Sequence, residues 1–286
     1  MGGQSVSLAQ VRRSAIERLK AVYPAYEAEA LCRALLSHVF PEWRFAWLDS
    51  GGRKPFPPAL LPQWEAALRR LLHQEPLAYI TGRVVFAEME LYLPSGVFIP
   101  RPETEAWAYA LRNLLRRPPK TILDIGTGSG ALALFLARGF PEATVYAIDK
   151  SPLAVLTARK NASLLQTRIR VERVAFGKEA LPPDFPAQWD LIVSNPPYVP
   201  WSRYAETSDN VRLYEPPDAI FCSDTYLYEA MAIFAEQSLS EEGAVAIELF
   251  PPDALTIATL WQSRGFSTVL NRDGGGHLRW MLARRI

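Results

Sequence analysis

The sequence contains few of the residues that build disulfide frameworks and metal sites. Its 286 residues include two cysteines, Cys32 and Cys222, and three histidines that lie far apart along the chain. Disulfide-dependent domains need several paired cysteines, and structural zinc sites need four clustered cysteine or histidine ligands. We therefore expect neither a disulfide framework nor a metal site.

Long apolar runs and a charge imbalance are also missing. The longest apolar stretches, such as Ala131–Ala137, are far shorter than the roughly 20 residues that span a bilayer. No apolar run near the N-terminus resembles a secretory signal. Lysine and arginine total 31 against 30 aspartates and glutamates, a formal net charge of +1, which argues against nucleic-acid binding through bulk charge. We expect a soluble cytoplasmic protein with no membrane association and no stable nucleic-acid binding.

The first part of the chain, residues 1–82, has a helical pattern. Ser7 and Gln10 have the spacing of a capping box, and apolar residues then recur at helical intervals. A second apolar stripe begins at Ala25. Residues 41–58 hold four prolines and two adjacent glycines, which predicts a loop before a third stripe. We predict a small helical bundle with its own core.

Short β-rich runs alternate with helical patterns over residues 118–286. The helical patterns include Ala131–Ala137 and Leu153–Asn161. The predicted strands are Thr121–Ile125, Thr144–Ile148, Ile169–Val174, Asp190–Ser194, Ala244–Leu249, Phe266–Leu270 and Leu278–Leu282. This alternation is typical of an α/β domain with a mostly parallel, Rossmann-like sheet. Residues 83–117 connect the two parts.

The first predicted strand ends in a glycine-rich run, Asp124-Ile125-Gly126-Thr127-Gly128-Ser129-Gly130. Glycines at such a turn let the backbone approach a ligand closely. The spacing is G-x-G-x-G instead of the G-x-G-x-x-G of a dinucleotide site, and the nearby carboxylate suits a cation better than a pyrophosphate. S-adenosylmethionine fits, because its ammonium and sulfonium are positive and it has no phosphate.

A second carboxylate, Asp149, ends the next predicted strand, nineteen residues after Gly130. In parallel α/β sheets an acidic residue at this place can accept hydrogen bonds from ribose hydroxyls. The alternative is a surface or capping carboxylate, since a helix start follows at Ser151. Together with the glycine loop, the ribose role is favoured.

The predicted strand Asp190–Ser194 is followed by Asn195-Pro196-Pro197-Tyr198. Ligands of parallel sheets bind outside the carboxyl ends of the strands, so this turn is placed for chemistry. The Asn195 side chain and the Pro196 carbonyl offer rigidly held acceptors, and Tyr198 offers a ring face. We interpret the turn as a socket for a planar –NH₂ group. Acceptors on both N–H hydrogens localise charge on the nitrogen in the transition state, which accelerates its attack on a sulfonium methyl.

Several motifs resemble those of the HemK/PrmC family, the release factor protein-glutamine N5-methyltransferases. Glu75–Gly82 reads EPLAYITG and is similar to the family's EPLQYI-x-G. Ile99–Glu105 matches its IPRPETE signature, which is far more specific than a glycine loop. Asp124–Gly130, Val193–Tyr198 and Tyr214–Pro216 match as well. The resemblance extends over most of the chain, from about residue 75 to the C-terminus.

The resemblance implies a class I S-adenosylmethionine-dependent methyltransferase fold, with a helical N-terminal domain that engages the protein substrate. It implies that the cofactor contacts Asp124, Ile125, Gly126, Thr127, Gly128, Asp149, Ala175 and Asn195. The same likeness assigns substrate binding to Asn195, Pro196, Pro197 and Tyr198, of which Asn195, Pro196 and Tyr198 are the catalytic candidates. The implied substrate is the glutamine of the Gly-Gly-Gln motif in class 1 peptide chain release factors.

The chain departs from the family pattern at two places near these residues. Val174-Ala175-Phe176 stands where the family usually has Asp-Trp-Phe, so we expect an altered adenine contact. Phe250–Asp253 stands where the family has Gly-x-x-Gln. The N-terminal Gly2-Gly3-Gln4 has the same sequence as the substrate tripeptide. Chance or an added remnant explains this match better than methylation of Gln4 by the protein itself.

Two other functions fit part of the pattern. An adenine-N6 methyltransferase would use the same socket on an extruded base, but it would need a basic recognition region. A non-catalytic family member could act as a binding module if the changed adenine position abolished cofactor binding. A nicotinamide dehydrogenase is disfavoured by the glycine spacing.

Overall fold

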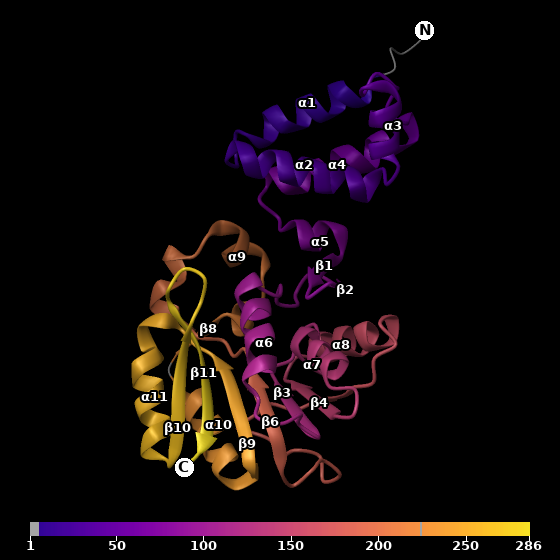
Figure 1. Ribbon diagram of the computed structural model, residues 1–286. Coiled ribbons are helices and arrows are strands. Elements are labelled where there is room, and N and C mark those ends of the chain that lie inside the picture. The colour runs from indigo at the N-terminus through magenta and orange to yellow at the C-terminus, as the bar shows by residue number, and fades with distance from the viewer. Residues whose placement is uncertain (1–5, 224) are drawn as a thin grey trace. The chain divides into compact units, whose positions relative to one another are not determined.

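The computed structural model describes residues 6–223 and 225–286 (Figure 1). The run Gly2-Gly3-Gln4 lies outside the described residues. Within the described part, the helices are too short or too polar to cross a membrane.

The chain folds into two compact units, and each is assembled from two stretches of sequence. The first consists of Met1–Gly82 and Ser208–Tyr214, and the second of Arg83–Thr207 and Glu215–Ile286. One hydrophobic core fills the first unit, and two cores lie in the second. A short piece from late in the sequence therefore completes the N-terminal unit.

The first unit is built from helices. They are α1 (Leu8–Leu19), α2 (Ala25–Val39), α3 (Trp43–Ser50), the 3-10 helix η1 (Pro58–Leu60), α4 (Leu61–Leu72), α5 (Leu77–Thr81) and α9 (Asp209–Tyr214). The predicted capping box is present: Ser7 Oγ accepts from the Gln10 N–H at 3.3 Å, and Gln10 Oε1 accepts from the Ser7 N–H at 2.8 Å. The apolar stripes of α1, α2 and α4 face one core around Trp64 and Leu68. The predicted helical bundle is confirmed.

The loop predicted over residues 41–58 is wrong in its middle, where α3 forms. The four prolines flank this helix, so none removes one of its hydrogen bonds. Trp43 is buried at its start, and the indole Nε1–H donates to Ser37 Oγ at 2.9 Å. Gly51 ends the helix with a φ of 59°, a conformation that glycine adopts without steric cost. The prolines and glycines thus mark the ends of a helix.

A seven-stranded sheet forms the centre of the second unit (Figure 1). Its strands are β3 (Thr121–Ile125), β4 (Thr144–Asp149), β5 (Arg170–Arg173), β6 (Trp189–Ser194), β9 (Leu239–Glu248), β10 (Phe266–Arg272) and β11 (Leu278–Arg285). Their order is β10-β11-β9-β6-β3-β4-β5; β11 is antiparallel to both neighbours, and the other pairs are parallel. The predicted mostly parallel sheet is confirmed.

Helices cover both faces of this sheet. On one face lie α6 (Pro102–Leu114), α7 (Ala131–Gly139) and α8 (Pro152–Leu164), and on the other α10 (Tyr226–Ser238) and α11 (Ala254–Ser263). Successive strand residues point to opposite faces, so Ile122 lies in the first of these cores and Leu123 in the second. Burial on both faces explains the nearly continuous apolar strands.

Residues 83–117, which the sequence predicts as a connection, contribute ordered elements to the second unit. An antiparallel hairpin of β1 (Arg83–Phe86) and β2 (Met89–Tyr92) precedes α6. The remaining short elements are β7 (Val199–Pro200), η2 (Trp201–Glu206), η3 (Pro217–Ala219), β8 (Phe221–Cys222), which pairs with β7, and η4 (Pro251–Asp253).

Asn161 of α8 ties the hairpin to the glycine-rich loop. Its side chain is fully buried. Oδ1 accepts from the Tyr92 N–H at 2.8 Å, and Nδ2 donates to the carbonyls of Tyr92 at 3.0 Å and Ser129 at 2.9 Å. One amide thus uses every available hydrogen-bonding direction but one.

The strand order reverses direction at β3. From β3 the chain continues to β4 and β5 on one side, and then crosses to β6 on the other side. Parallel sheets of this kind bind ligands at such a reversal, outside the carboxyl ends of the strands. The glycine loop follows β3 and Asn195 follows β6, so both predicted motifs meet there.

Candidate active site

A cavity of about 720 Å³ opens at the carboxyl ends of β3, β4 and β6. This volume lies in the usual range for sites that enclose small organic ligands. The described residues that line it all belong to the second unit. Among the predicted site residues, the lining includes Asp124, Ile125, Gly126, Thr127, Gly128, Asp149, Ala175, Asn195, Pro196 and Pro197. Tyr198 is not part of this lining.

The glycine-rich loop bends over the end of β3 and is held by β4. The N–H groups of Gly126 and Thr127 both donate to the Ile148 carbonyl, at 2.9 and 3.0 Å. Gly126 and Gly128 have φ values of 75° and 56°, and a Cβ on either would meet no atom within 4 Å. The glycines are therefore needed for their backbone conformation, and the space beside them stays open for a ligand.

Asp124 places a buried carboxylate on the cavity wall. Oδ2 accepts from Thr127 Oγ1 at 2.6 Å and from the Ala133 N–H at 3.2 Å. Oδ1 is buried with no hydrogen-bond partner among the described residues. Burial raises the pKa of this carboxyl to about 7, although both hydrogen bonds oppose the shift. An unpartnered buried carboxylate oxygen is costly, and a cationic ligand group would satisfy it.

Asp149 has both carboxylate oxygens engaged with backbone N–H groups. Oδ2 accepts from Gly128 at 2.9 Å and Oδ1 from Ser151 at 2.8 Å. Burial raises its pKa, and these two hydrogen bonds counter the shift. Each oxygen keeps a lone pair, so the carboxylate can also accept from ligand hydroxyls. Ser151 caps α8 through its own Oγ, which accepts from the Ala154 N–H at 3.3 Å.

Ala175 lies beyond the end of β5, on the same cavity wall. Its N–H donates to Glu179 Oε2 at 2.8 Å, and Glu179 also lines the cavity. The neighbouring Phe176 packs edge-on against Phe234, with ring centroids 5.4 Å apart. The carboxylate of Glu179, four residues after Ala175, therefore lies beside the Val174-Ala175 segment, where the aspartate of the family pattern is missing.

Asn195 and Pro196 present oxygen atoms at the end of β6. Asn195 Nδ2 donates to Thr104 Oγ1 at 3.0 Å. Within residues 6–223 and 225–286, neither Asn195 Oδ1 nor the Pro196 carbonyl has a hydrogen-bond donor. The preceding Ser194 donates from Oγ to the Ile125 carbonyl at 2.8 Å, which holds the end of β6 against β3. Two neighbouring acceptors are thus available to a ligand.

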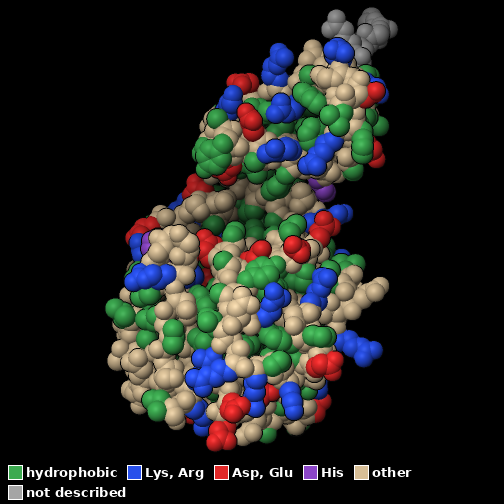
Figure 2. Space-filling view, in the orientation of Figure 1, with side chains coloured by type: hydrophobic (Ala, Val, Ile, Leu, Met, Phe, Trp, Pro, Cys, Tyr) green, Lys and Arg blue, Asp and Glu red, His purple; other side chains and the backbone are tan. Residues whose placement is uncertain are grey.

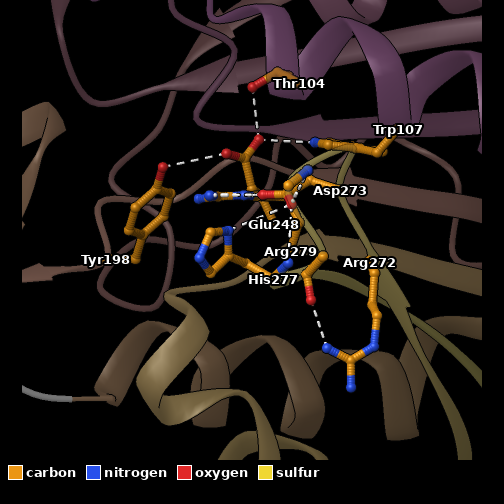
Figure 3. A network of polar contacts seen from close by, with 10 residues as sticks. Thr104, Trp107, Tyr198, Glu248, Arg272, Asp273, His277 and Arg279 are labelled. Atoms are coloured by element: carbon orange, nitrogen blue, oxygen red, sulfur yellow. Dashed lines mark hydrogen bonds and ion pairs between the residues drawn. The ribbon is translucent and has the colours of Figure 1, made fainter.

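Glu248, the last residue of β9, lies at the centre of a buried polar network (Figure 3). Its Oε2 accepts from Thr104 Oγ1 at 2.6 Å and from Trp107 Nε1 at 2.7 Å. Its Oε1 accepts from the Tyr198 hydroxyl at 3.2 Å. Burial raises the pKa of Glu248. The pKa of Tyr198 is also raised, mainly by burial and to a lesser extent by the negative charge of Glu248. The Tyr198 ring stacks on Phe250, with centroids 6.3 Å apart and planes at 19°.

The Ile99–Glu105 segment is anchored by a second buried carboxylate, Glu215. Its Oε1 pairs with the Arg101 guanidinium at 2.5 Å, and its Oε2 accepts from the Ile99 N–H at 3.2 Å. The Glu215 side chain is 1% exposed. These contacts join two motifs that lie far apart in the sequence, one around Ile99 and one around Tyr214.

Sequence reasoning missed Thr104 and Glu248. Glu103 and Glu105 lie in the first turn of α6, where negative charge is favourable. Thr104 between them points inward and is 3% exposed. The available signal for Glu248 was a single carboxylate in an otherwise apolar predicted strand. Among the described residues, no His, Cys, Asp and Glu side chains gather as a metal site.

Comparison with known proteins decides the family. Residues 10–82 match the model of the PrmC N-terminal domain, and residues 88–209 match that of the methyltransferase small domain. The chain is 35% identical over 269 residues to a release factor glutamine methyltransferase of Deinococcus radiodurans, covering 93% of this chain and 94% of that protein. This chain belongs to the release factor glutamine methyltransferase family.

Other release factor glutamine methyltransferases are also similar to this chain. The protein from Bordetella pertussis is 35% identical and covers 88% of each chain; that from Flavobacterium psychrophilum is 39% identical and covers 66% of this chain and 68% of its own. Among solved structures, a ribosomal protein L11 methylase of Lactobacillus delbrueckii is similar, with 20% identity, a TM-score of 0.49, and coverage of 66% and 81%. The relatives confirm the predicted family, and the match to the methyltransferase small domain, together with the mostly parallel sheet, confirms the class I methyltransferase fold.

Proposed function

We propose that this protein transfers a methyl group from S-adenosylmethionine to the side-chain amide nitrogen of the glutamine in the Gly-Gly-Gln motif of class 1 release factors. One observation carries the proposal: the two acceptors at Asn195 and Pro196 share a cavity with the glycine loop and Asp124. Membership of the release factor glutamine methyltransferases supports the substrate.

The residues of the cavity fit S-adenosylmethionine, which supplies a methyl group on a positively charged sulfur. Asp124 Oδ1, buried and unpartnered, is the partner for the ammonium. Asp149 accepts from the ribose hydroxyls with its remaining lone pairs. The open backbone of Gly126–Gly128 lets the cofactor pass close to the loop. Ala175 lies at the adenine position, where Glu179 offers an acceptor for the exocyclic amine.

Asn195 and Pro196 bind the substrate amide through its two N–H hydrogens. An amide nitrogen is a weak nucleophile because its lone pair is delocalised into the carbonyl. As the nitrogen forms its bond to the methyl carbon, its N–H groups become more acidic, so both acceptors bind the transition state more tightly than the ground state. The electron pair of the breaking carbon–sulfur bond would go to sulfur, and one N–H proton of the nitrogen would pass to solvent water, which leaves a neutral methylated amide. The fixed φ angles of Pro196 and Pro197 hold the acceptors in position.

The contact of Tyr198 with the substrate stays a prediction. Its ring stacks on Phe250, and its hydroxyl donates to Glu248. We infer that these contacts hold the socket rigid and that Tyr198 offers its second ring face to the substrate. In this proposal the first unit, whose residues 10–82 match the PrmC N-terminal domain, recognises the release factor. The proposed reaction takes place in the cytoplasm.

Intact mass spectrometry of an unmodified class 1 release factor, incubated with this protein and S-adenosylmethionine, tests the proposal. We expect a gain of one methyl group that maps to the glutamine of Gly-Gly-Gln. A release factor with that glutamine replaced by alanine is the control and should gain nothing.

Two results would contradict the proposal and point to the alternatives. Cofactor binding without methylation of the release factor, but with methylation of adenine in a nucleic acid, would favour the adenine-N6 methyltransferase. Absence of cofactor binding in calorimetry would favour the binding module.

A further inference from the structure

Thr104 and Glu248 connect Asn195 to the interior of the second unit. Asn195 Nδ2 donates to Thr104 Oγ1 at 3.0 Å, and Thr104 Oγ1 donates to Glu248 Oε2 at 2.6 Å. Thr104 is 3% and Glu248 1% exposed, so the hydrogen bond between these two side chains is shielded from water. The three residues come from the end of β6, the first turn of α6 and the end of β9.

The chemistry of the donors fixes the direction of this chain of hydrogen bonds. An indole N–H can only donate, so Trp107 Nε1 at 2.7 Å from Glu248 Oε2 makes that oxygen an acceptor. The single proton of the Thr104 hydroxyl must then point to the same oxygen. Toward Asn195, Thr104 can therefore only accept. This direction applies to the ionised carboxylate, whose two oxygens can only accept.

We propose that Glu248, acting through Thr104, fixes the orientation of the Asn195 side-chain amide, so that its oxygen and not its NH₂ group faces the substrate. The inference rests on the proposed function, in which Asn195 accepts a hydrogen bond from the glutamine amide. A flipped Asn195 would present two donors to a substrate group that itself donates. Thr104 and Glu248 are positioning residues in this reaction, since neither touches the reacting atoms.

The same carboxylate also steadies the far end of the socket. Glu248 Oε1 accepts from the Tyr198 hydroxyl at 3.2 Å, three residues after Asn195 (Figure 3). One buried side chain thus holds both ends of the Asn195–Tyr198 turn, one directly and one through Thr104.

The decisive variant is Thr104→Val, which keeps the shape of the side chain and removes the hydroxyl. We expect kcat for the release factor to fall about ten- to a hundredfold, the usual effect of losing one oriented hydrogen bond in a dry site. The KM for the release factor and the Kd for S-adenosylmethionine should stay within about threefold. Thr104→Ser restores the hydroxyl and should recover most of the activity. Glu248→Gln, whose carbonyl can still accept from Thr104 and Trp107, should retain more activity than Glu248→Met.

Thr157→Val is the matched control. Thr157 is also buried, at 2% exposure, and donates to the Leu153 carbonyl at 2.8 Å, outside this network. The control should leave kcat unchanged. Equal kcat values for Thr104→Val and Thr157→Val would overturn the proposal, as would a loss of cofactor binding in Thr104→Val that accounts for its lower activity.

A measurement without turnover separates this inference from the proposed function. In ¹⁵N-labelled protein, the Asn195 side-chain amide signal, identified by its absence in Asn195→Ala, should exchange slowly with solvent in the wild type and in Thr104→Ser. It should exchange much faster in Thr104→Val. Fast exchange in the wild type would refute the fixed amide. An inactive wild type with a protected amide would instead count against the proposed substrate and leave the orientation standing.

Discussion

Two aspartates on the cavity wall have different tasks because their hydrogen bonds differ. Asp149 has a backbone donor on each oxygen, whereas Asp124 has two donors on Oδ2 and none on the buried Oδ1. The first is satisfied before any ligand arrives. In the proposed function the ammonium of the cofactor completes the second, so the charge of the ligand would be coupled to that of Asp124.

This coupling predicts that cofactor affinity depends on pH. The pKa of Asp124 is raised to about 7, so its ionised fraction, which the ammonium requires, grows as the pH rises from 6 to 8. The Kd for S-adenosylmethionine should be about fivefold weaker at pH 6 than at pH 7. Above about pH 8 the ligand's α-amino group loses its proton and affinity should fall again. Calorimetric titrations at pH 6, 7 and 8 measure this.

Asp124→Asn is the comparison for that series. The variant keeps the volume of the side chain and loses the titrating group, so it should bind the cofactor weakly and with no rise between pH 6 and 7. If the wild type itself showed a flat Kd over this range, Asp124 would not be the partner of the ammonium.

At the scale of single residues, the sequence predicted those cavity residues that lie in contiguous motifs at strand ends. Parallel strands bring such motifs together whatever the rest of the chain does. Thr104 and Glu248 could not be found in this way, because they are 144 positions apart and meet through tertiary packing. Their role depends on hydrogen-bond direction, which has no sequence pattern.

Among the elements, α8 does more than cover the sheet. Asn161 on its buried side makes three hydrogen bonds, two to β2 and one to the Ser129 carbonyl in the glycine-rich loop. The hairpin, the helix and the loop therefore share one anchor. Loss of these hydrogen bonds should lower both the stability of the fold and the affinity for the cofactor.

Asn161→Ala should lower the free energy of unfolding by roughly 2–4 kcal/mol, because it leaves buried backbone groups unpaired. It should also raise the Kd for S-adenosylmethionine several-fold, since the loop loses its link to α8. Thermal unfolding and calorimetry measure the two effects. Asn271→Ala removes a side-chain bond to the Val269 carbonyl at the exposed edge of β10, and should change neither quantity appreciably. A loss of stability with unchanged Kd would show that the loop is held by other contacts.

Whole elements were predictable where one periodicity dominates. All seven strands of the central sheet follow from short β-rich runs, and the central ones, such as β3 and β6, are buried on both faces. The helix α3 was missed because proline and glycine content was taken as evidence for a loop, although these residues flank the helix and cap it. The β1–β2 hairpin was missed because strands of only four residues are too short to show a clear period.

For the whole molecule, the described residues that line the cavity, where we propose that the cofactor binds, all belong to the second unit. Hydrogen exchange with mass detection should therefore show cofactor-dependent protection at the ends of β3, β4 and β6. Amides of α1, α2 and α4, which surround the separate core of the first unit, should exchange at unchanged rates. Protection that spread through these helices would mean that the first unit responds to the cofactor.

The sequence placed the division between the units at residue 82, but gave no sign that residues 208–214 belong with the N-terminal part. Such an assignment needs contacts between residues far apart in the chain, and one of them is the hydrogen bond from the Tyr214 hydroxyl to the His73 carbonyl at 2.8 Å. Nothing in a six-residue helix that has no buried residue predicts which unit it belongs to.

This arrangement has a consequence for exchanging parts between relatives. A chimera that replaces residues 1–82 alone would give the foreign helices an α9 that evolved with another bundle, and would lose a matched partner for His73. The natural module for transplantation is discontinuous: residues 1–82 need one junction, and residues 208–214 need two more. Grafting both pieces together is the route by which the specificity of one family member could be transferred to another.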